Sequence, residues 1–137
     1  MGSRSSNYMR DYESKRGYIR HFPELMASAD LEFQSRLGAL ADIAYQASRR
    51  LSAREKELIL IAILAARMAT SEHMSVHLTK ALQMGIDERD ILEALELLVV
   101  PCGVTPFEMA VELLNTIAPL SSADVTDGRR GATLEAE

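Results

Sequence analysis

The sequence predicts an all-α fold, a helical bundle of about five to six helices. Apolar residues recur with helical spacing in several segments, capping patterns precede the expected helices, and no segment alternates like a strand. Hydrophobic residues make up 47% of the 137 residues, whereas aromatic residues make up only 5% and tryptophan is absent. We therefore expect a core of aliphatic side chains, alanine and methionine, which suits close packing of helices.

The N-terminal part of the chain is predicted to be the least regular. Residues 1–11 are mostly polar and are expected to be disordered. Residues 12–27 are expected to hold short helical pieces that are broken at Gly17 and before Pro23.

Two longer helices follow. The first is expected over residues 30–48, with Asp30 available to cap it. The second begins at Ser52, because Ser52-Ala53-Arg54-Glu55 has the pattern of a capping box. Residues 57–66 are apolar on nearly every face, so this helix is expected to be the buried central one. Its isoleucines would also suit a strand, but the capping box, the length and the alanines favour a helix.

Three further helices complete the predicted bundle. One begins with Ser71 as its N-cap and ends at Gly85, a residue type typical of helix ends. The next opens at Asp87 and is broken at 101–103, and the last covers 105–117. The expected organisation is one domain over 12–118, followed by a flexible tail over 119–137.

Composition limits the classes of partner. The formal net charge of −5 argues against nucleic acid, which requires a concentrated positive surface. No apolar run is long enough for a transmembrane helix and the polar N-terminus does not resemble a signal peptide, so we expect no membrane partner and a cytoplasmic location. The single cysteine, Cys102, excludes an intramolecular disulfide and a two-thiol redox cycle within one chain.

Two histidines, His73 and His77, are the leading candidates for chemistry. Their four-residue spacing places both imidazoles on one helix face, where they could move protons or hold a metal. His77 is the predicted acid/base, the alternative being a packed histidine with one hydrogen bond. His73 lies near a helix N-terminus, which favours a neutral ring; it is either part of the site or an interface histidine. A metal site would need a third ligand, for which Glu57 and Glu72 are the obvious candidates, and none is predicted.

The residue types of four other residues predict roles in the site. Glu57 is a carboxylate in an otherwise apolar helix and needs a partner, either a histidine or an arginine. Arg54 and Arg67 could hold a substrate carboxylate through a planar fork, or form solvated salt bridges. Cys102 is expected to be a small buried residue near the pocket.

Four segments carry motifs in a fixed order. They are Leu51-Ser52-Ala53-Arg54-Glu55-Lys56-Glu57-Leu58, His77-Leu78-Thr79-Lys80-Ala81-Leu82-Gln83-Met84-Gly85, Ile86-Asp87-Glu88-Arg89-Asp90-Ile91-Leu92-Glu93-Ala94-Leu95, and Cys102-Gly103-Val104 followed by Glu108-Met109-Ala110. In this order they resemble motifs of the carboxymuconolactone decarboxylase family, and the similarity extends over residues 12–117. The second segment is similar to the family's His-x-x-x-Ala-Leu-x-x-Gly.

The resemblance implies an all-helical, alkylhydroperoxidase D-like subunit that assembles into a ring, a trimer or a hexamer. It implies that His77 is the family's central histidine and Glu57 its motif glutamate. One activity in the family is decarboxylation of a muconolactone in the breakdown of aromatic compounds, without metal or organic cofactor. The other is peroxide reduction by a Cys-x-x-Cys pair; here His73 stands four residues before His77 and no thiol is near, so dithiol peroxidase chemistry is excluded.

The leading functional hypothesis is therefore a cofactor-free lyase. It would act on a small carboxylated or lactone-like substrate, with His77 as acid/base, Glu57 and His73 in support, and an arginine holding the carboxylate. One alternative is a non-catalytic oligomeric scaffold or small-molecule binding protein of the same fold. Another is a metal-assisted hydrolase or hydratase that uses the two histidines.

Overall fold

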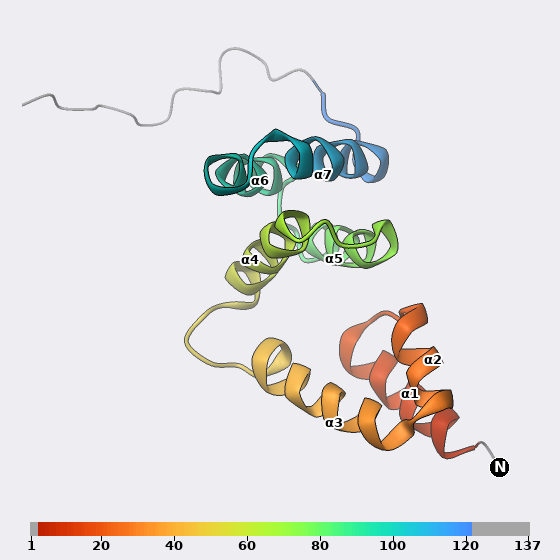
Figure 1. Ribbon diagram of the computed structural model, residues 1–137. Coiled ribbons are helices and arrows are strands. Elements are labelled where there is room, and N and C mark those ends of the chain that lie inside the picture. The colour runs from red at the N-terminus through yellow and green to blue at the C-terminus, as the bar shows by residue number, and fades with distance from the viewer. Residues whose placement is uncertain (1–2, 122–137) are drawn as a thin grey trace, which may run out of the picture.

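The computed structural model describes residues 3–121, which form seven α-helices, one π-helical segment and no strand (Figure 1). The elements are α1 (Arg4–Arg16), α2 (His21–Ala29), α3 (Leu31–Ala41), the π-helix η1 (Asp42–Gln46), α4 (Ala53–Ala66), α5 (Ser71–Gln83), α6 (Glu88–Cys102) and α7 (Val104–Ile117). The all-α prediction is confirmed, with more helices than the five to six expected. Most of the predicted tail lies outside the described residues.

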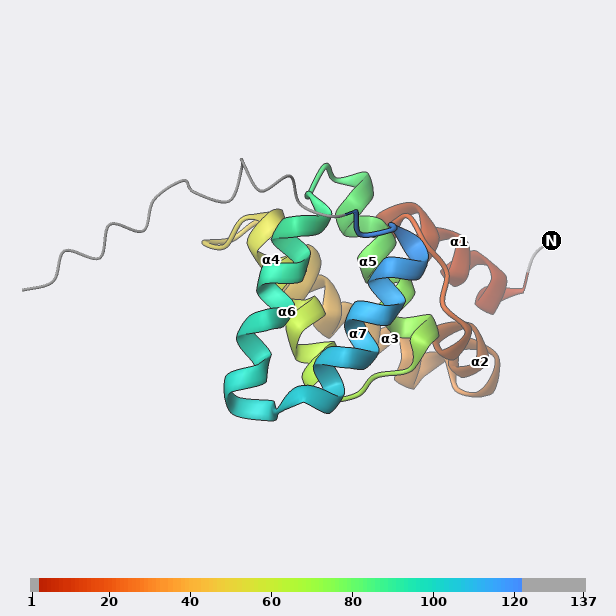
Figure 2. The ribbon, with the colours of Figure 1, turned by 90° about the horizontal axis from the view of Figure 1, so that it is seen from above.

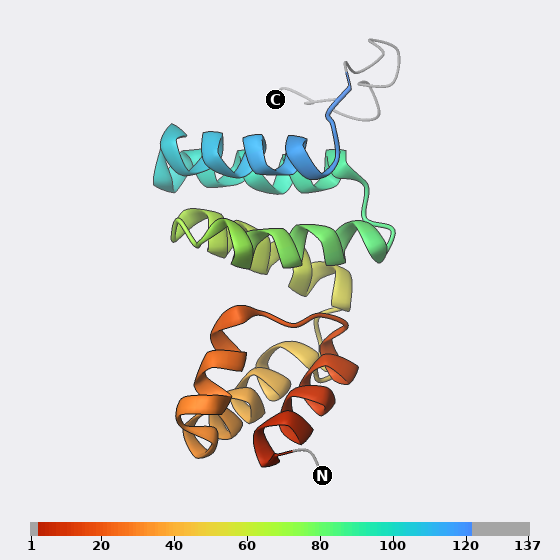
Figure 3. The same ribbon diagram turned by 90° about the vertical axis from the view of Figure 1, so that its right-hand side faces the viewer.

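The helices lie in three layers (Figures 1 and 3). Helices α1–α3 form one outer layer, α4 and α5 the middle layer, and α6 and α7 the other outer layer. Seen from above, α6 and α7 cover α4 and α5 (Figure 2). The site described below lies between the middle layer and the N-terminal layer.

The main core joins α4–α7. Its fully buried large residues are Ile61, Leu78, Ile91, Leu95 and Leu114, with at least one from each of the four helices. Complete burial of such an aliphatic side chain contributes about 1.5–3 kcal/mol relative to exposure. Aliphatic packing of this kind makes the middle layer a firm support for the polar groups that α4 and α5 carry.

The predicted disorder of residues 1–11 is wrong over most of its length, because α1 begins at Arg4. The Ser3 side chain caps this helix by accepting a hydrogen bond from the Ser6 backbone N–H. Met9 and Tyr12 are buried in a second, smaller core together with Ala27 of α2. This contact crosses between helices, so the polar composition of the segment gave no sign of it.

Both prolines expected to break helices lie inside them. Pro23 lies in the first turn of α2, where a proline is tolerated because its missing N–H would have no partner within the helix. Helix α6 continues through Pro101 to Cys102, and its C-cap is Gly103, whose φ of 80° is a conformation that glycine adopts without strain. The helix therefore ends within the predicted range 101–103, but the proline itself does not break it.

Two predicted helix caps are confirmed, whereas the single long helix predicted over 30–48 is not regular throughout. Asp30 caps α3 by accepting from the Phe33 N–H, and the Ser52–Glu55 capping box is present in full. The N-cap of α5 is Thr70 rather than Ser71. The helix predicted over 30–48 changes to π-helical geometry in η1, and such segments are frequent at functional sites.

Helix α4 is central in position but only half covered. Ile61, Leu64 and Ala65 are buried, whereas Ile59 and Ile63 are exposed to solvent.

Among the described residues, no helix is both long and apolar enough to cross a membrane.

Candidate functional site

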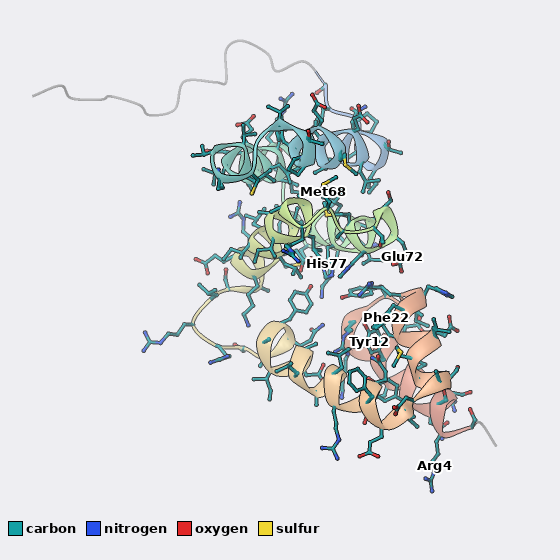
Figure 4. The ribbon with its side chains drawn as sticks, viewed as in Figure 1. Arg4, Tyr12, Phe22, Met68, Glu72 and His77 are labelled. Carbon is teal, nitrogen blue, oxygen red and sulfur yellow. The ribbon has the colours of Figure 1, made fainter. Side chains whose placement is uncertain are left out.

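A carboxylate and an imidazole meet inside the protein. Glu57 on α4 is 1% exposed and His77 on α5 is 3% exposed, and His77 Nδ1 lies 2.7 Å from Glu57 Oε1. The capping box fixes where α4 starts, and this places Glu57 on the face that also carries Ile61 and Leu64. Figure 4 shows His77 on the side of the middle layer that faces α1–α3.

Tyr45 of η1 completes the hydrogen bonding of this carboxylate. Its hydroxyl donates to Glu57 Oε2, so each carboxylate oxygen accepts one hydrogen bond. Burial, followed by the hydrogen bond to Glu57 and the charge of Glu57, raises the pKa of Tyr45. Tyr45 therefore keeps its proton and acts as a donor. Lys56 Nζ donates to the backbone oxygen of Ala47 at 2.5 Å, which ties the end of η1 to α4.

Aromatic rings surround the imidazole of His77. The rings of Tyr18 and Tyr45 stand edge-on to it, with centroid separations of 5.5 and 5.6 Å. Burial raises the pKa of Tyr18 to about 12, with smaller contributions from Tyr12 and Glu57. The site thus presents two uncharged phenols around one imidazole.

His73 adds a second imidazole on the same face, with its ring centroid 5.4 Å from that of His77. Burial, followed by the positive charge of Arg20 and the proximity of His77, lowers the pKa of His73 to about 4, although the charge of Glu72 opposes this effect. His73 is therefore uncharged at neutral pH, as its place near the start of α5 had indicated.

Glu72 holds the N-terminal layer against α5 (Figure 4). One of its carboxylate oxygens accepts from the His21 backbone N–H at 3.2 Å, and the other lies 3.6 Å from Arg20 Nε. This attachment keeps the α1–α2 connection, which carries Tyr18, beside His77.

Lys80 is the remaining charged group of the site. Its Nζ lies 4.6 Å from the ring centroid of Tyr45 and 5.6 Å from that of Tyr18. Burial lowers the pKa of Lys80, although the negative charge of Glu57 opposes this effect. Lys80 also lines a cavity of about 410 Å³ that has Tyr18 in its wall.

The three residues predicted to bind substrate lie elsewhere on this chain. Arg54 is exposed and pairs with Asp90, with Nη2 2.5 Å from Oδ2, which is the solvated salt bridge left open by the sequence. Arg67 is exposed at the C-terminal end of α4. Cys102 was expected to be buried but is exposed, in an apolar groove between α4 and α6. Its place as the last residue of α6 explains the difference.

Sequence reasoning missed Tyr18, Tyr45 and Lys80. Lys80 follows His77 by three residues on one helix, so helical spacing could have indicated it. The two tyrosines come from a connection and from a π-helical segment, and no spacing rule links them to His77. Within residues 3–121, no group of three or more His, Cys, Asp and Glu side chains has the arrangement of a metal site.

The geometry is suited to proton transfer. When His77 donates its Nδ1–H to Glu57, the tautomer is fixed and Nε2 is left to exchange a proton with a bound molecule. Tyr45 in turn orients the carboxylate that orients the imidazole. Because such chains hold a base in one position, they are typical of acid/base sites in enzymes.

The fold and the site together define a class of protein. It is all-helical and has a buried glutamate–histidine pair with no thiol beside that pair. The chain belongs to the carboxymuconolactone decarboxylase family, whose sequence model matches residues 32–116. The match includes Tyr45, Glu57, His73 and His77, whereas Tyr18 precedes it. No curated protein and no solved structure matches the chain.

Proposed function

We propose that the protein is a cofactor-free lyase that decarboxylates a small carboxylated or lactone-like substrate, with His77 as its acid/base. The observation that carries this proposal is the buried hydrogen bond between Glu57 and His77. Family membership supports the fold and the type of site. The breakdown of aromatic compounds is the matching metabolic role, and the chemistry requires no organic cofactor.

In the proposed reaction, the bond between the substrate and its carboxylate breaks, and carbon dioxide leaves. The electron pair of that bond passes into a conjugated carbonyl of the substrate, which becomes a dienolate. His77 then gives a proton from Nε2 to the dienolate carbon and is reprotonated from solvent, so one proton is consumed in each turnover.

Other groups assist this step. Glu57 stabilises the imidazolium form of His77 while that form lasts, and Tyr45 keeps the carboxylate in place. His73 is neutral and can orient the substrate without adding charge. Exclusion of water from a bound dienolate would strengthen each of these interactions.

A screen for carbon dioxide release tests the proposal. Muconolactones and hydroxyaromatic acids are offered to the wild-type protein, to His77→Ala and to His21→Ala, in which an exposed histidine outside the site is changed. We expect turnover of at least one acid, a loss of about 100-fold or more in His77→Ala, and no change in His21→Ala. Equal turnover by His77→Ala would contradict the proposal, and inactivity of the wild type across the screen would favour a scaffold or binding protein.

We also propose that the chain forms a homo-oligomer, a trimer or a hexamer. The α4–α6 face, formed by Ile59, Ile63, Leu97 and Val100, supports this: Leu97 is 71% and Val100 90% exposed. A large exposed apolar patch is typical of an interface. Light scattering on the purified protein should give a multiple of the chain mass, and a monomer at micromolar concentration would contradict the assembly.

A further inference from the structure

We propose that the cavity beside Tyr18 binds the carboxylate of a small organic acid, and that Lys80 is the residue that holds this anion. The residues that line the cavity include Arg16, Tyr18, Ser75, Thr79, Lys80 and Gln83. The inference rests on the proposed function for the size and class of the acid. It replaces Arg54 and Arg67, which lie away from the cavity, as the carboxylate-binding residues.

The cavity has the size and the polar groups of a ligand site. Its volume of about 410 Å³ falls within the range usual for small-molecule pockets, roughly 300–1,000 Å³. Ser75, Thr79 and Gln83 follow one another at four-residue steps on α5 and so line one wall with two hydroxyls and an amide. These groups can donate hydrogen bonds to an anion that enters the cavity.

Lys80 differs from the other two lysines of the chain. Lys15 pairs with Asp11 at 2.9 Å, and Lys56 donates to Ala47. Within residues 3–121, Lys80 Nζ makes neither a hydrogen bond nor an ion pair, although it is partly buried against the rings of Tyr18 and Tyr45. An ammonium removed from water without a counter-ion is unfavourable, and a bound carboxylate would supply that counter-ion.

Arg16, the second cation in the wall, is already engaged. Its Nη2 lies 2.7 Å from Asp42 Oδ1 and donates to the Gly38 backbone oxygen at 3.2 Å, and its guanidinium lies over the ring of Tyr12. Arg16 therefore adds positive potential to the cavity while holding the N-terminal layer together. Lys80 is left with donors for a ligand.

The cavity is close to the candidate acid/base. Tyr18 belongs both to the wall of the cavity and to the rings around His77, and Lys80 follows His77 by one turn of α5. An ammonium bound to the departing carboxylate would stabilise the ground state more than the transition state, because that carboxylate loses its negative charge as carbon dioxide forms. The acid group at Lys80 is therefore one that remains on the substrate, so the substrate carries a second acid group.

Binding of matched acid and amide probes tests this assignment without turnover. Benzoate and adipate, with the neutral analogues benzamide and adipamide, are titrated into the ¹⁵N-labelled full chain and followed by NMR. We expect saturable shifts of the backbone amides of residues 75–84 with the acids only. Lys80→Met should weaken acid binding by about tenfold or more, while Lys80→Arg should largely retain it and Lys15→Met should leave it unchanged.

Three results would overturn the assignment. They are equal binding of acids and amides, acid binding by Lys80→Met as tight as that of the wild type, and shifts confined to a second cavity, which Arg49, Arg50 and Lys56 help to line. If Lys80→Met does not fold, the assignment is still tested by the comparison of acids with amides and by the Lys80→Arg variant. The titration involves no turnover, so failure of the catalytic proposal is distinguished from failure of this one.

Discussion

Glu57 Oε1 and His77 Nδ1 lie 2.7 Å apart although the two residues belong to different helices and are 20 positions apart in the chain. Both side chains are almost fully buried, and the rings of Tyr18 and Tyr45 stand beside the imidazole. Replacement of such a buried pair by apolar residues is often neutral or stabilising, so the pair is poorly explained by stability alone. The geometry instead favours a role in chemistry.

Glu57→Gln tests whether the carboxylate orients His77. The amide keeps the size of the side chain but carries one acceptor oxygen in place of two, so it cannot accept from both His77 and Tyr45. We expect turnover to fall about 10- to 100-fold or more, as for partners that orient a functional histidine. The free energy of unfolding should fall by about 1–3 kcal/mol, measured by urea denaturation.

Glu55→Gln is the matched control for this change. Glu55 lies half a turn earlier on α4, is exposed, and accepts from the Ser52 N–H in the capping box, which glutamine also completes. Turnover of this variant should equal that of the wild type. A Glu57→Gln enzyme as active as Glu55→Gln would show that the carboxylate is only structural.

Tyr45→Phe tests the outer member of the hydrogen-bonded chain. The change leaves Glu57 Oε2 buried without a donor, which should cost about 1–3 kcal/mol in unfolding free energy and lower turnover less than Glu57→Gln does. Tyr8→Phe is the control, since the Tyr8 hydroxyl donates to the Gln34 backbone oxygen in the N-terminal layer, away from His77. Reduced turnover in both variants alike would mean that the loss reflects stability rather than the position of Glu57.

The parts predictable from sequence were those set by local or elementary rules. The Ser52–Glu55 capping box and the Asp30 cap involve residues three positions apart, so a single segment contains the whole signal. The pairing of Glu57 with a histidine followed from the need of a buried carboxylate for a partner, and it was only slightly favoured over pairing with an arginine. Only the structure shows that the partner of Glu57 is His77.

The parts that were missed depend on contacts between layers. Helix α1 was read as disordered because its few apolar residues gain their partners only when Met9 and Tyr12 meet α2. Tyr18 reaches His77 through the attachment of the N-terminal layer to Glu72, and Tyr45 through the π-helical turn. Neither a composition nor a helical period contains this information.

Gly38→Ala should loosen the N-terminal layer. Gly38 is buried on α3, and an added Cβ would collide with the hydroxyl of Tyr8. We expect a loss of about 1–3 kcal/mol in unfolding free energy, the usual cost of overpacking. Addition of Tyr8→Phe should recover part of it, because the ring carbon that remains lies at ordinary contact distance, 3.6 Å. Losses that simply add in the double variant would contradict the predicted clash.

His73 should make stability depend on pH in mildly acidic solution. Its pKa is about 4 in the folded protein and 6.5 in an unfolded chain, so between these values the unfolded state binds more protons. The free energy of unfolding therefore falls as the pH is lowered from about 6.5 toward 4, and this effect vanishes above neutral pH. The slope from this group cannot exceed about 1.4 kcal/mol per pH unit, the limit for uptake of one proton, and solvent screening of a partly exposed ring lowers it.

Urea denaturation of the wild type, His73→Asn and His21→Asn at several pH values between about 4.5 and 7 measures this dependence. His73→Asn cannot take up the proton, so its stability should vary less with pH than that of the wild type over this window. His21→Asn, with an exposed side chain outside the site, should keep the wild-type dependence. Parallel pH curves for the wild type and His73→Asn would mean that His73 takes up its proton equally well in the folded and unfolded chain, and that burial does not keep it neutral beside His77.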